Sequence, residues 1–189
     1  ALKSLMASLG VTNIDGRHDG TKLDPSLGRA SYVFNAGIVG IEEADAILLV
    51  GTDPRREASV LNARIRKRWR MGPVRIALVG EAADLNYDVE RLGTGGETLS
   101  AIANGSHAFA QVLKDAKKPL IIVGQGALTR ADGAAVLAMA AKIAAASNAV
   151  SAEWNGFAVL HTAAARVGAL DLGFVPGAAA VCRTAKPFH

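Results

Sequence analysis

The chain is organised around three short apolar runs, at residues 47–50, 74–79 and 120–123. Apart from Arg75, polar residues do not interrupt these runs, as they would in a strand with one solvated face, so each predicts a strand buried on both faces. A helical pattern follows each run. Buried strands that alternate with helices predict an α/β fold, in which a Rossmann-like parallel sheet carries helices on both faces.

Helical periodicity marks the segments between these strands. It is clearest over residues 57–69, where apolar residues recur every three or four positions and Arg and Lys occupy another side. The same pattern predicts helices over residues 1–9, 99–103, 109–116, 132–146 and 157–167. Residues 11–14 are a candidate short strand, and residues 85–92 are either a short third strand or an extended loop.

The length and the glycine and proline content suggest where the domain ends. A chain of 189 residues is long enough for one substantial core or two small ones. We expect one Rossmann-like domain over residues 1–172 and a poorly ordered tail over residues 173–189, which contain Pro176, Gly177 and Pro187. The chain also lacks an initiator methionine and opens in a helical pattern, so we expect a piece of a longer subunit.

Cysteine and histidine usage argues against a metal centre. The single cysteine, Cys182, allows neither an internal disulfide nor a cysteine-ligated cluster or zinc site. The four histidines, His18, His107, His161 and His189, are scattered and show no metal-ligand spacing. We therefore expect no metal site. No set of nucleophile, base and orienting residue emerges from the spacing either, so we expect no catalytic residues in this chain.

The formal net charge of +4 arises largely from a basic cluster at residues 64–70. On a helix of 3.6 residues per turn, Arg64, Lys67 and Arg68 share one side, while the apolar positions face elsewhere. We predict that these three side chains are exposed and form a contact face for a partner protein. Only Trp69 is aromatic in the cluster, which argues against nucleic-acid binding. No apolar run approaches the ~20 residues that a spanning helix needs, so we expect no membrane insertion.

Two loops that follow predicted strands carry candidate ligand-binding residues. Gly51, Thr52 and Asp53 follow the first strand, and Gly124 and Gly126 follow the third. Backbone amides at such loops cradle phosphate groups in nucleotide-binding folds. A third glycine-rich stretch, at residues 93–96, precedes a helix and has the same potential.

A structural interpretation explains the first loop equally well. Asp53 has the place of a helix cap and Pro54 that of the first helical residue. The loop lacks the G-x-G-x-x-G pattern, and Asp53 would repel a phosphate. We therefore expect no cofactor at these loops and treat Gly51, Thr52, Asp53, Gly124 and Gly126 as vestigial or alternative ligand positions.

Several stretches of the sequence resemble a known family. They are Glu42-Glu43-Ala44-Asp45, Val50-Gly51-Thr52-Asp53-Pro54-Arg55, Asn62-Ala63-Arg64-Ile65-Arg66-Lys67, Gly105-Ser106-His107 and Ala169-Leu170-Asp171-Leu172-Gly173. In this order they resemble the carboxyl-terminal region of the large iron-sulfur subunit (the 75 kDa subunit) of respiratory complex I, NADH-quinone oxidoreductase. The resemblance covers most of the chain and is strongest to the mitochondrial and alphaproteobacterial form.

That region of the family is similar to the cofactor domains of formate dehydrogenase and DMSO reductase, which bind molybdopterin. The resemblance therefore implies an inherited cofactor fold that has lost its cofactor. It also implies that iron-sulfur clusters are held by cysteines in an amino-terminal part absent from this chain. The chain would be a non-catalytic structural domain of an enzyme that transfers electrons from NADH to quinone.

The resemblance also implies surroundings for the chain. Its partners would be other subunits of complex I, in the hydrophilic arm of this membrane-associated complex. The arm lies on the cytoplasmic side of the bacterial inner membrane or on the matrix side of the mitochondrial one. The alternative function is a domain of an active molybdopterin-dependent oxidoreductase, which would bind a nucleotide or a pterin at the loops that begin at Gly51 and Gly124.

Overall fold

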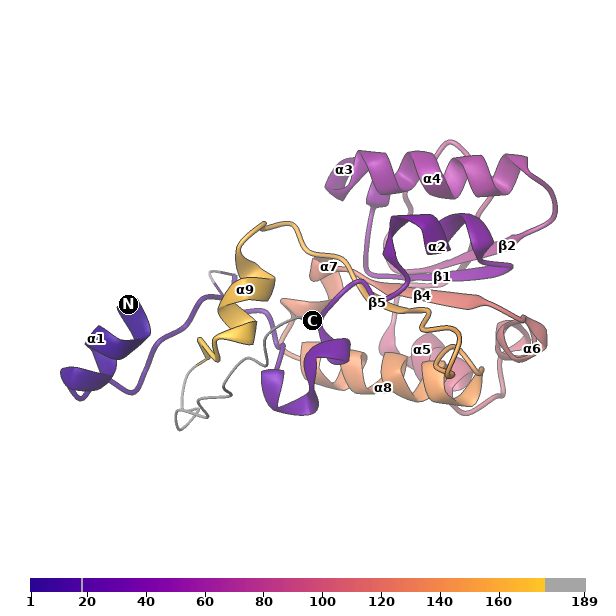
Figure 1. Cartoon of the computed structure of the whole chain (residues 1–189). Helices are drawn as coiled ribbons and strands as arrows, with labels where there is room; N and C mark the ends of the chain where they lie inside the picture. Colours follow the sequence, from indigo (N-terminus) through magenta and orange to yellow (C-terminus); the bar gives the residue numbers. More distant parts are fainter. Residues whose placement is uncertain (18, 176–189) are drawn as a thin grey trace.

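A five-stranded parallel sheet lies at the centre of the fold, in the order β3-β2-β1-β4-β5 (Figure 1). A computed structural model of the chain describes residues 1–17 and 19–175. The strands are β1 (Ala46–Val50), β2 (Arg75–Val79), β3 (Glu90–Gly93), β4 (Pro119–Val123) and β5 (Phe157–Val159). Each residue of β1 pairs with β2 on one side and with β4 on the other. The prediction that the three apolar runs form one parallel sheet is confirmed.

Helices cover both faces of this sheet, as predicted (Figure 1). They are α1 (Leu2–Ser8), α2 (Gly37–Glu43), α3 (Pro54–Glu57), α4 (Ser59–Arg70), α5 (Gly96–Ala103), α6 (Ala108–Asp115), α7 (Gln125–Leu128), α8 (Gly133–Ala146) and α9 (Arg166–Asp171), with 3₁₀ turns η1 (Pro25–Leu27) and η2 (Arg29–Ser31). Side chains of β1 alternate between the two layers. Ile47 and Leu49 pack with α2 and α4, whereas Leu48 packs with α5, α6 and α8. A strand buried on both faces has no need of polar residues, which explains its unbroken apolar run.

Three shorter predictions need correction. The helix predicted over residues 157–167 is wrong, because this segment contains the buried strand β5, a connecting loop and the start of α9. A four-residue apolar run is ambiguous between strand and helix, and its pairing with β4 decides the outcome here. The short strand predicted at residues 11–14 does not form. Residues 85–92 are mostly loop, and β3 begins only at Glu90.

The two ends of the described chain differ in their packing. Helix α1 projects away from the sheet and buries none of its residues (Figure 1). Val175 is buried, and the Phe174 carbonyl accepts a hydrogen bond of 3.0 Å from the Gly16 amide. The rest of the expected tail, residues 176–189 with Cys182, lies outside the described residues, as does His18. Among the helices that the structure describes, none is both long enough and apolar enough to cross a membrane.

The basic cluster is partly internal. Arg64 and Lys67 both bind the carboxylate of Glu42 on the neighbouring helix α2, with a Lys67 Nζ–Glu42 Oε2 distance of 2.6 Å. Hydrogen bonds from Lys67 and Arg64 hold the pKa of Glu42 below its ordinary value. The predicted exposure is therefore correct for Lys67 but wrong for Arg64 and Arg68, which are partly buried because α2 lies beside α4.

Arg68 ties the end of α4 to the loops around it. Its guanidinium donates hydrogen bonds to the backbone carbonyls of Ala44 (2.6 Å), Gly72 (3.3 Å) and Pro73 (3.2 Å). Ala44 is fully buried, so its carbonyl has no access to water if Arg68 is removed.

We expect Arg68→Ala to lower the free energy of unfolding by about 1–3 kcal/mol, since it leaves a buried acceptor without a donor. Arg66→Ala, on the exposed side of the same helix, should change it by less than about 0.5 kcal/mol. Urea unfolding followed by circular dichroism measures both values. Equal effects of the two substitutions would contradict this assignment.

Candidate functional site

A hollow of about 1140 Å³ opens at the carboxyl ends of β1, β2 and β3. Residues 51–53, 80–84 and 94–96 line it, together with parts of α3 and of the segment from α7 to α8. In open α/β sheets, ligands bind at this edge, next to the point where the strand order reverses. That point lies between β1 and β4 here. The hollow thus adjoins the expected binding position, with the glycine-rich residues 94–96 on its far wall.

Carboxylates occupy the amides at the start of α3. Asp53 caps the helix by accepting hydrogen bonds from the amides of Arg55 (3.1 Å) and Arg56 (3.4 Å), and proline is the first helical residue. Glu57 accepts from the Asp53 amide at 3.0 Å and from the Thr52 hydroxyl at 2.8 Å. The structural interpretation of this loop is confirmed. These amides are the donors that a bound anion would need, and the protein's own carboxylates already satisfy them.

The two candidate loops pack directly against each other. A Cβ atom added at Gly51 would lie 2.5 Å from the Cβ of Ala127, and one added at Gly124 would lie 2.4 Å from the Cβ of Thr52. At Gly126 it would lie 2.8 Å from the Gly51 carbonyl oxygen. The structure thus brings the candidate residues together, as the sequence suggested. However, the loops meet so closely that no space for a phosphate remains between them.

The charged lining of the hollow is acidic overall. Its ionic groups are Arg55, Arg56, Arg130, Asp53, Glu57, Glu81, Asp84 and Asp132. The ion pairs are Arg55–Asp84 at 2.5 Å, Arg56–Asp53 at 3.5 Å and Arg130–Asp132 at 2.7 Å. Hydrogen bonds from Arg55 and Arg130 lower the pKa values of Asp84 and Asp132, which keeps these carboxylates ionised. Five carboxylates against three guanidinium groups leave a negative excess, which disfavours phosphate binding.

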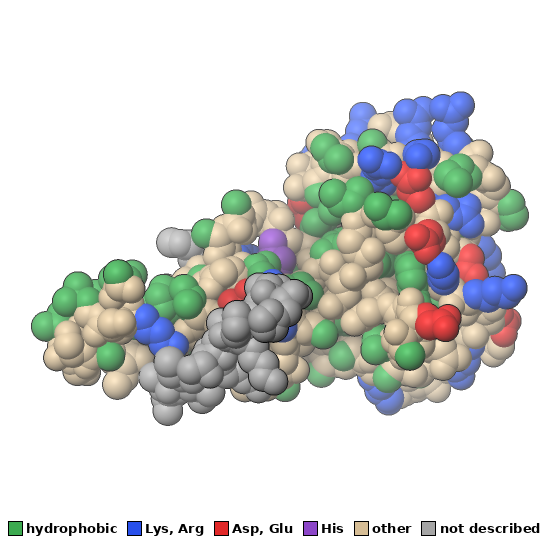
Figure 2. Space-filling view, in the orientation of Figure 1, with side chains coloured by type: hydrophobic (Ala, Val, Ile, Leu, Met, Phe, Trp, Pro, Cys, Tyr) green, Lys and Arg blue, Asp and Glu red, His purple; other side chains and the backbone are tan. Residues whose placement is uncertain are grey.

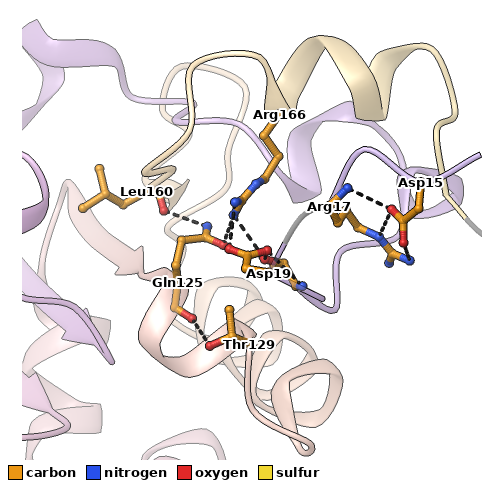
Figure 3. Close-up of polar contacts among 8 residues, drawn as sticks. Asp15, Arg17, Asp19, Gln125, Thr129, Leu160 and Arg166 are labelled. Atoms are coloured by element: carbon orange, nitrogen blue, oxygen red, sulfur yellow. Dashed lines mark hydrogen bonds and ion pairs between the residues drawn. The ribbon is translucent and has the colours of Figure 1, made fainter.

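A buried polar cluster holds the β4 loop from behind (Figure 3). Arg166 of α9, only 4% exposed, pairs through Nη2 with Asp19 Oδ2 at 2.7 Å and donates through Nη1 to the Thr21 hydroxyl at 3.1 Å. Gln125 accepts hydrogen bonds from Arg166 and Thr21 and donates to the Leu160 carbonyl at 2.8 Å. Its side chain is therefore fully engaged within the protein.

Sequence reasoning missed this cluster. Asp19 and Thr21 lie in an aperiodic loop, and Arg166 lies in the segment wrongly predicted as one helix. Burial alone would raise the pKa of Asp19, but hydrogen bonds from Thr21 and the charge of Arg166 together lower it. The available signal was an arginine within an otherwise apolar segment, because such a residue needs an acidic partner when it is buried.

The described histidines have structural roles. His107 caps α6 by accepting a hydrogen bond from the Phe109 amide at its Nδ1 (3.1 Å). His161 contacts the Tyr32 carbonyl through Nε2, while its Nδ1 is buried without a partner. Burial and the nearby charge of Arg166 lower the pKa of His161. Within residues 1–17 and 19–175, no three His, Cys, Asp or Glu side chains form a group able to hold a metal ion.

Gly124→Ala should destabilise the protein by about 1–3 kcal/mol, because the new methyl group must push apart two loops already in contact. Gly96→Ala is the matched control, since a Cβ there has no atom within 4 Å, and it should change the stability by less than about 0.5 kcal/mol. Urea denaturation of both variants measures the difference. A Gly124→Ala variant as stable as the control would show that the contact between the loops yields easily.

The stability should fall as the pH drops below the ordinary histidine pKa of 6.5. His161 resists protonation in the folded state, whereas in the unfolded chain it takes up a proton near that value, so acid favours unfolding. His161→Gln retains a donor for the Tyr32 carbonyl but has no titrating ring. Its stability should therefore decrease less between pH 7.5 and pH 5 in urea titrations. Parallel pH profiles for the two proteins would contradict the assignment.

Comparison with known proteins gives the family. The sequence profile of molybdopterin oxidoreductases matches residues 1–188. The chain is 47% identical over 186 residues to the mitochondrial NADH dehydrogenase (ubiquinone) iron-sulfur protein 1 of Solanum tuberosum, which covers 98% of the chain and 25% of that protein. It is 45% identical to the mitochondrial NADH-ubiquinone oxidoreductase 78 kDa subunit of Neurospora crassa, over 85% of the chain and 22% of that protein.

A bacterial relative agrees with these two. Identity to a subunit of the NADH-quinone oxidoreductase of Rickettsia bellii is 40%, over 92% of the chain and 25% of the relative. The chain thus spans about a quarter of the length of the curated relatives that it matches. With the family profile matched along almost its whole length and a parallel α/β sheet at its centre, the chain belongs to the molybdopterin oxidoreductase family.

Proposed function

We propose that this chain is a structural domain of the large iron-sulfur subunit of NADH-quinone oxidoreductase, respiratory complex I. Relatives named as parts of that enzyme are 40–47% identical to it and match 85–98% of its length, which supports the proposal. In this function the domain takes part in electron transfer from NADH to quinone without carrying the electrons. Iron-sulfur clusters held by another part of the subunit do so, and the domain itself binds no metal or organic cofactor.

The contact between the β1 and β4 loops is the observation that carries the proposal. A dinucleotide cofactor needs free amides and open space beside the strand-order reversal. Here Asp53 and Glu57 use the amides, and Gly51 and Gly124 close the space by lying against the opposite loop. The excess of carboxylates in the adjoining hollow repels phosphates further. A fold that has filled its own ligand position is suited to a scaffolding role.

One observation favours a second function. The hollow of about 1140 Å³ is larger than most small-molecule pockets, so a nucleotide or a pterin fits there by size. The alternative is therefore a domain of a molybdopterin-dependent oxidoreductase that holds its ligand over β2 and β3, beside the closed loops. The acidic lining counts against an anionic ligand in that position.

The proposed surroundings follow from the same assignment. The partners are other subunits of complex I, and the domain lies in the hydrophilic arm, on the cytoplasmic side of the bacterial membrane or the matrix side of the mitochondrial one. We propose the contact face around Arg64, Lys67 and Arg68 on α4. Lys67 is the exposed member, whereas Arg64 and Arg68 shape the face by fixing α2 and the adjoining loops against α4.

Filling the hollow tests the proposal. Ala82 lies on its exposed rim, so Ala82→Trp introduces a large ring there without disturbing the core. In the complete enzyme we expect unchanged assembly and unchanged NADH–quinone turnover. The buried Leu48→Ala is the positive control for loss of the domain, since a core truncation of this kind costs about 2–5 kcal/mol and should reduce the amount of assembled enzyme.

The isolated chain provides a second measurement. A nucleotide present at 100 times its dissociation constant would stabilise the folded chain by about 2.7 kcal/mol. We expect guanine nucleotides at millimolar concentration to leave the melting temperature unchanged. Thermal stabilisation by a nucleotide, or lost turnover in a folded and assembled Ala82→Trp enzyme, would instead support the ligand-binding alternative.

A further inference from the structure

The outward side of α4 combines exposed apolar and basic side chains. Lys and Arg side chains gather along this helix, with apolar side chains beside them over α2 (Figure 2). The face consists of the exposed α4 residues Val60, Ala63, Arg66, Lys67 and Arg70 and the α2 residues Ile38 and Val39. We call this set the α4 face. It excludes Arg64 and Arg68, whose guanidinium groups are bound within the domain.

Helical geometry places the α4 residues of this face together. At 3.6 residues per turn, Val60, Ala63, Lys67 and Arg70 form one stripe, whereas Ile65 points to the opposite side and is fully buried. Val60 is 66% exposed even though it belongs to a helix that packs well along its other side. The domain's own packing therefore does not account for an apolar residue on this stripe.

The charge of the face is unbalanced. Arg64, Arg66, Lys67, Arg68 and Arg70 carry five positive charges, and Glu42 is the carboxylate that pairs with this group. Arg66 and Arg70 form no hydrogen bond or ion pair with any residue in the described part of the chain. The excess of four charges equals the formal net charge of the whole chain. Basic character is thus concentrated on one helix.

Apolar and basic character occupy different ends of the face. Helices α2 and α4 lie side by side, and Ile38, Val39 and Val60 all lie in the first turns of their helices (Figure 1). Arg66, Lys67 and Arg70 lie in the second half of α4. Val39 is 70% exposed and Ile38 48%, so the apolar end presents branched side chains from two adjacent helices.

We propose that the α4 face binds an amphipathic acidic helix of a neighbouring subunit. Apolar residues of that helix pack on Ile38 and Val60, and its carboxylates pair with Arg66, Lys67 and Arg70. Guanidinium groups suit such pairing because they bind carboxylates in a bidentate geometry. The inference rests on the proposed function, since the partner is another chain of the same enzyme. It deepens that proposal by naming the residues and the chemistry of the contact.

A protein fits this face better than nucleic acid or a lipid surface. Single-stranded nucleic acid requires aromatic stacking platforms, and the one aromatic residue of this helix, Trp69, is partly buried beneath it. An anionic bilayer favours an apolar stripe of large side chains flanked by cations along its whole length. Here the apolar side chains are small, and they are confined to one end.

Charge reversal on the complete subunit tests the inference. Arg66→Glu with Arg70→Glu should weaken its association with the rest of the enzyme by about tenfold or more, because like charges then face each other across the contact. Lys114→Glu with Lys117→Glu is the matched control. It makes the same change in net charge at and just after α6, which packs on the other face of the sheet, and should assemble normally. Both double variants should retain the parental melting temperature.

A photoreactive residue in place of Ala63 identifies what lies on the face. In the assembled enzyme we expect cross-links to a helix rich in Asp and Glu on a neighbouring subunit. Cross-links to lipid, to nucleic acid or to a second copy of this chain would overturn the inference, as would normal assembly of the Arg66→Glu, Arg70→Glu variant. If the unmodified subunit does not copurify with complex I at all, the proposed function fails, and this result is distinguishable from failure at the α4 face alone.

Discussion

The close approach of two backbone loops at the centre of the sheet is the constraint on which the character of the domain depends. Strands β1 and β4 pair along their full length, so Gly51 and Gly124 leave the sheet at the same level. The Gly124 amide donates to the Val50 carbonyl at 2.9 Å, which extends the ladder beyond the last paired residues. Without side chains at these positions the loops touch. A residue with a Cβ atom on either loop would force them apart and reopen the position where related folds hold a ligand.

The polar groups around this contact act in the same direction. Asp53 and Glu57 satisfy the amides at the start of α3 from the front, and Arg166 with Gln125 fixes the β4 loop from behind. Each hydrogen bond that stabilises the domain removes a donor that an anionic cofactor would need. Stability and ligand binding therefore compete for the same groups here. The domain keeps the architecture of a cofactor fold while using its ligand-binding groups for internal packing.

How far the sequence predicts this arrangement depends on the range of each interaction. The central strands and the Asp53 cap were predictable, because an unbroken apolar run or an Asp-Pro helix start depends on neighbours within a few residues. Strand β5 was not, since its three residues are fixed as a strand by pairing with β4. The Arg166 cluster was not either, because Arg166 meets Thr21 across 145 positions and Gln125 across 41. Of the candidate ligand residues, the sequence predicted their proximity but not that their backbones would meet.

The basic helix shows how tertiary contacts decide what a local pattern means. Periodicity alone places Arg64, Lys67 and Arg68 on one side of α4, which suggested one uniform exposed surface. The neighbouring helix α2 then supplies Glu42 to two of these cations, and the buried Ala44 carbonyl binds the third. What remains for a partner is decided by this subtraction. Arg66 and Arg70, which periodicity did not group with these three, keep their full hydrogen-bonding capacity, so the surface available for binding is rotated around α4 from the one that the sequence indicated.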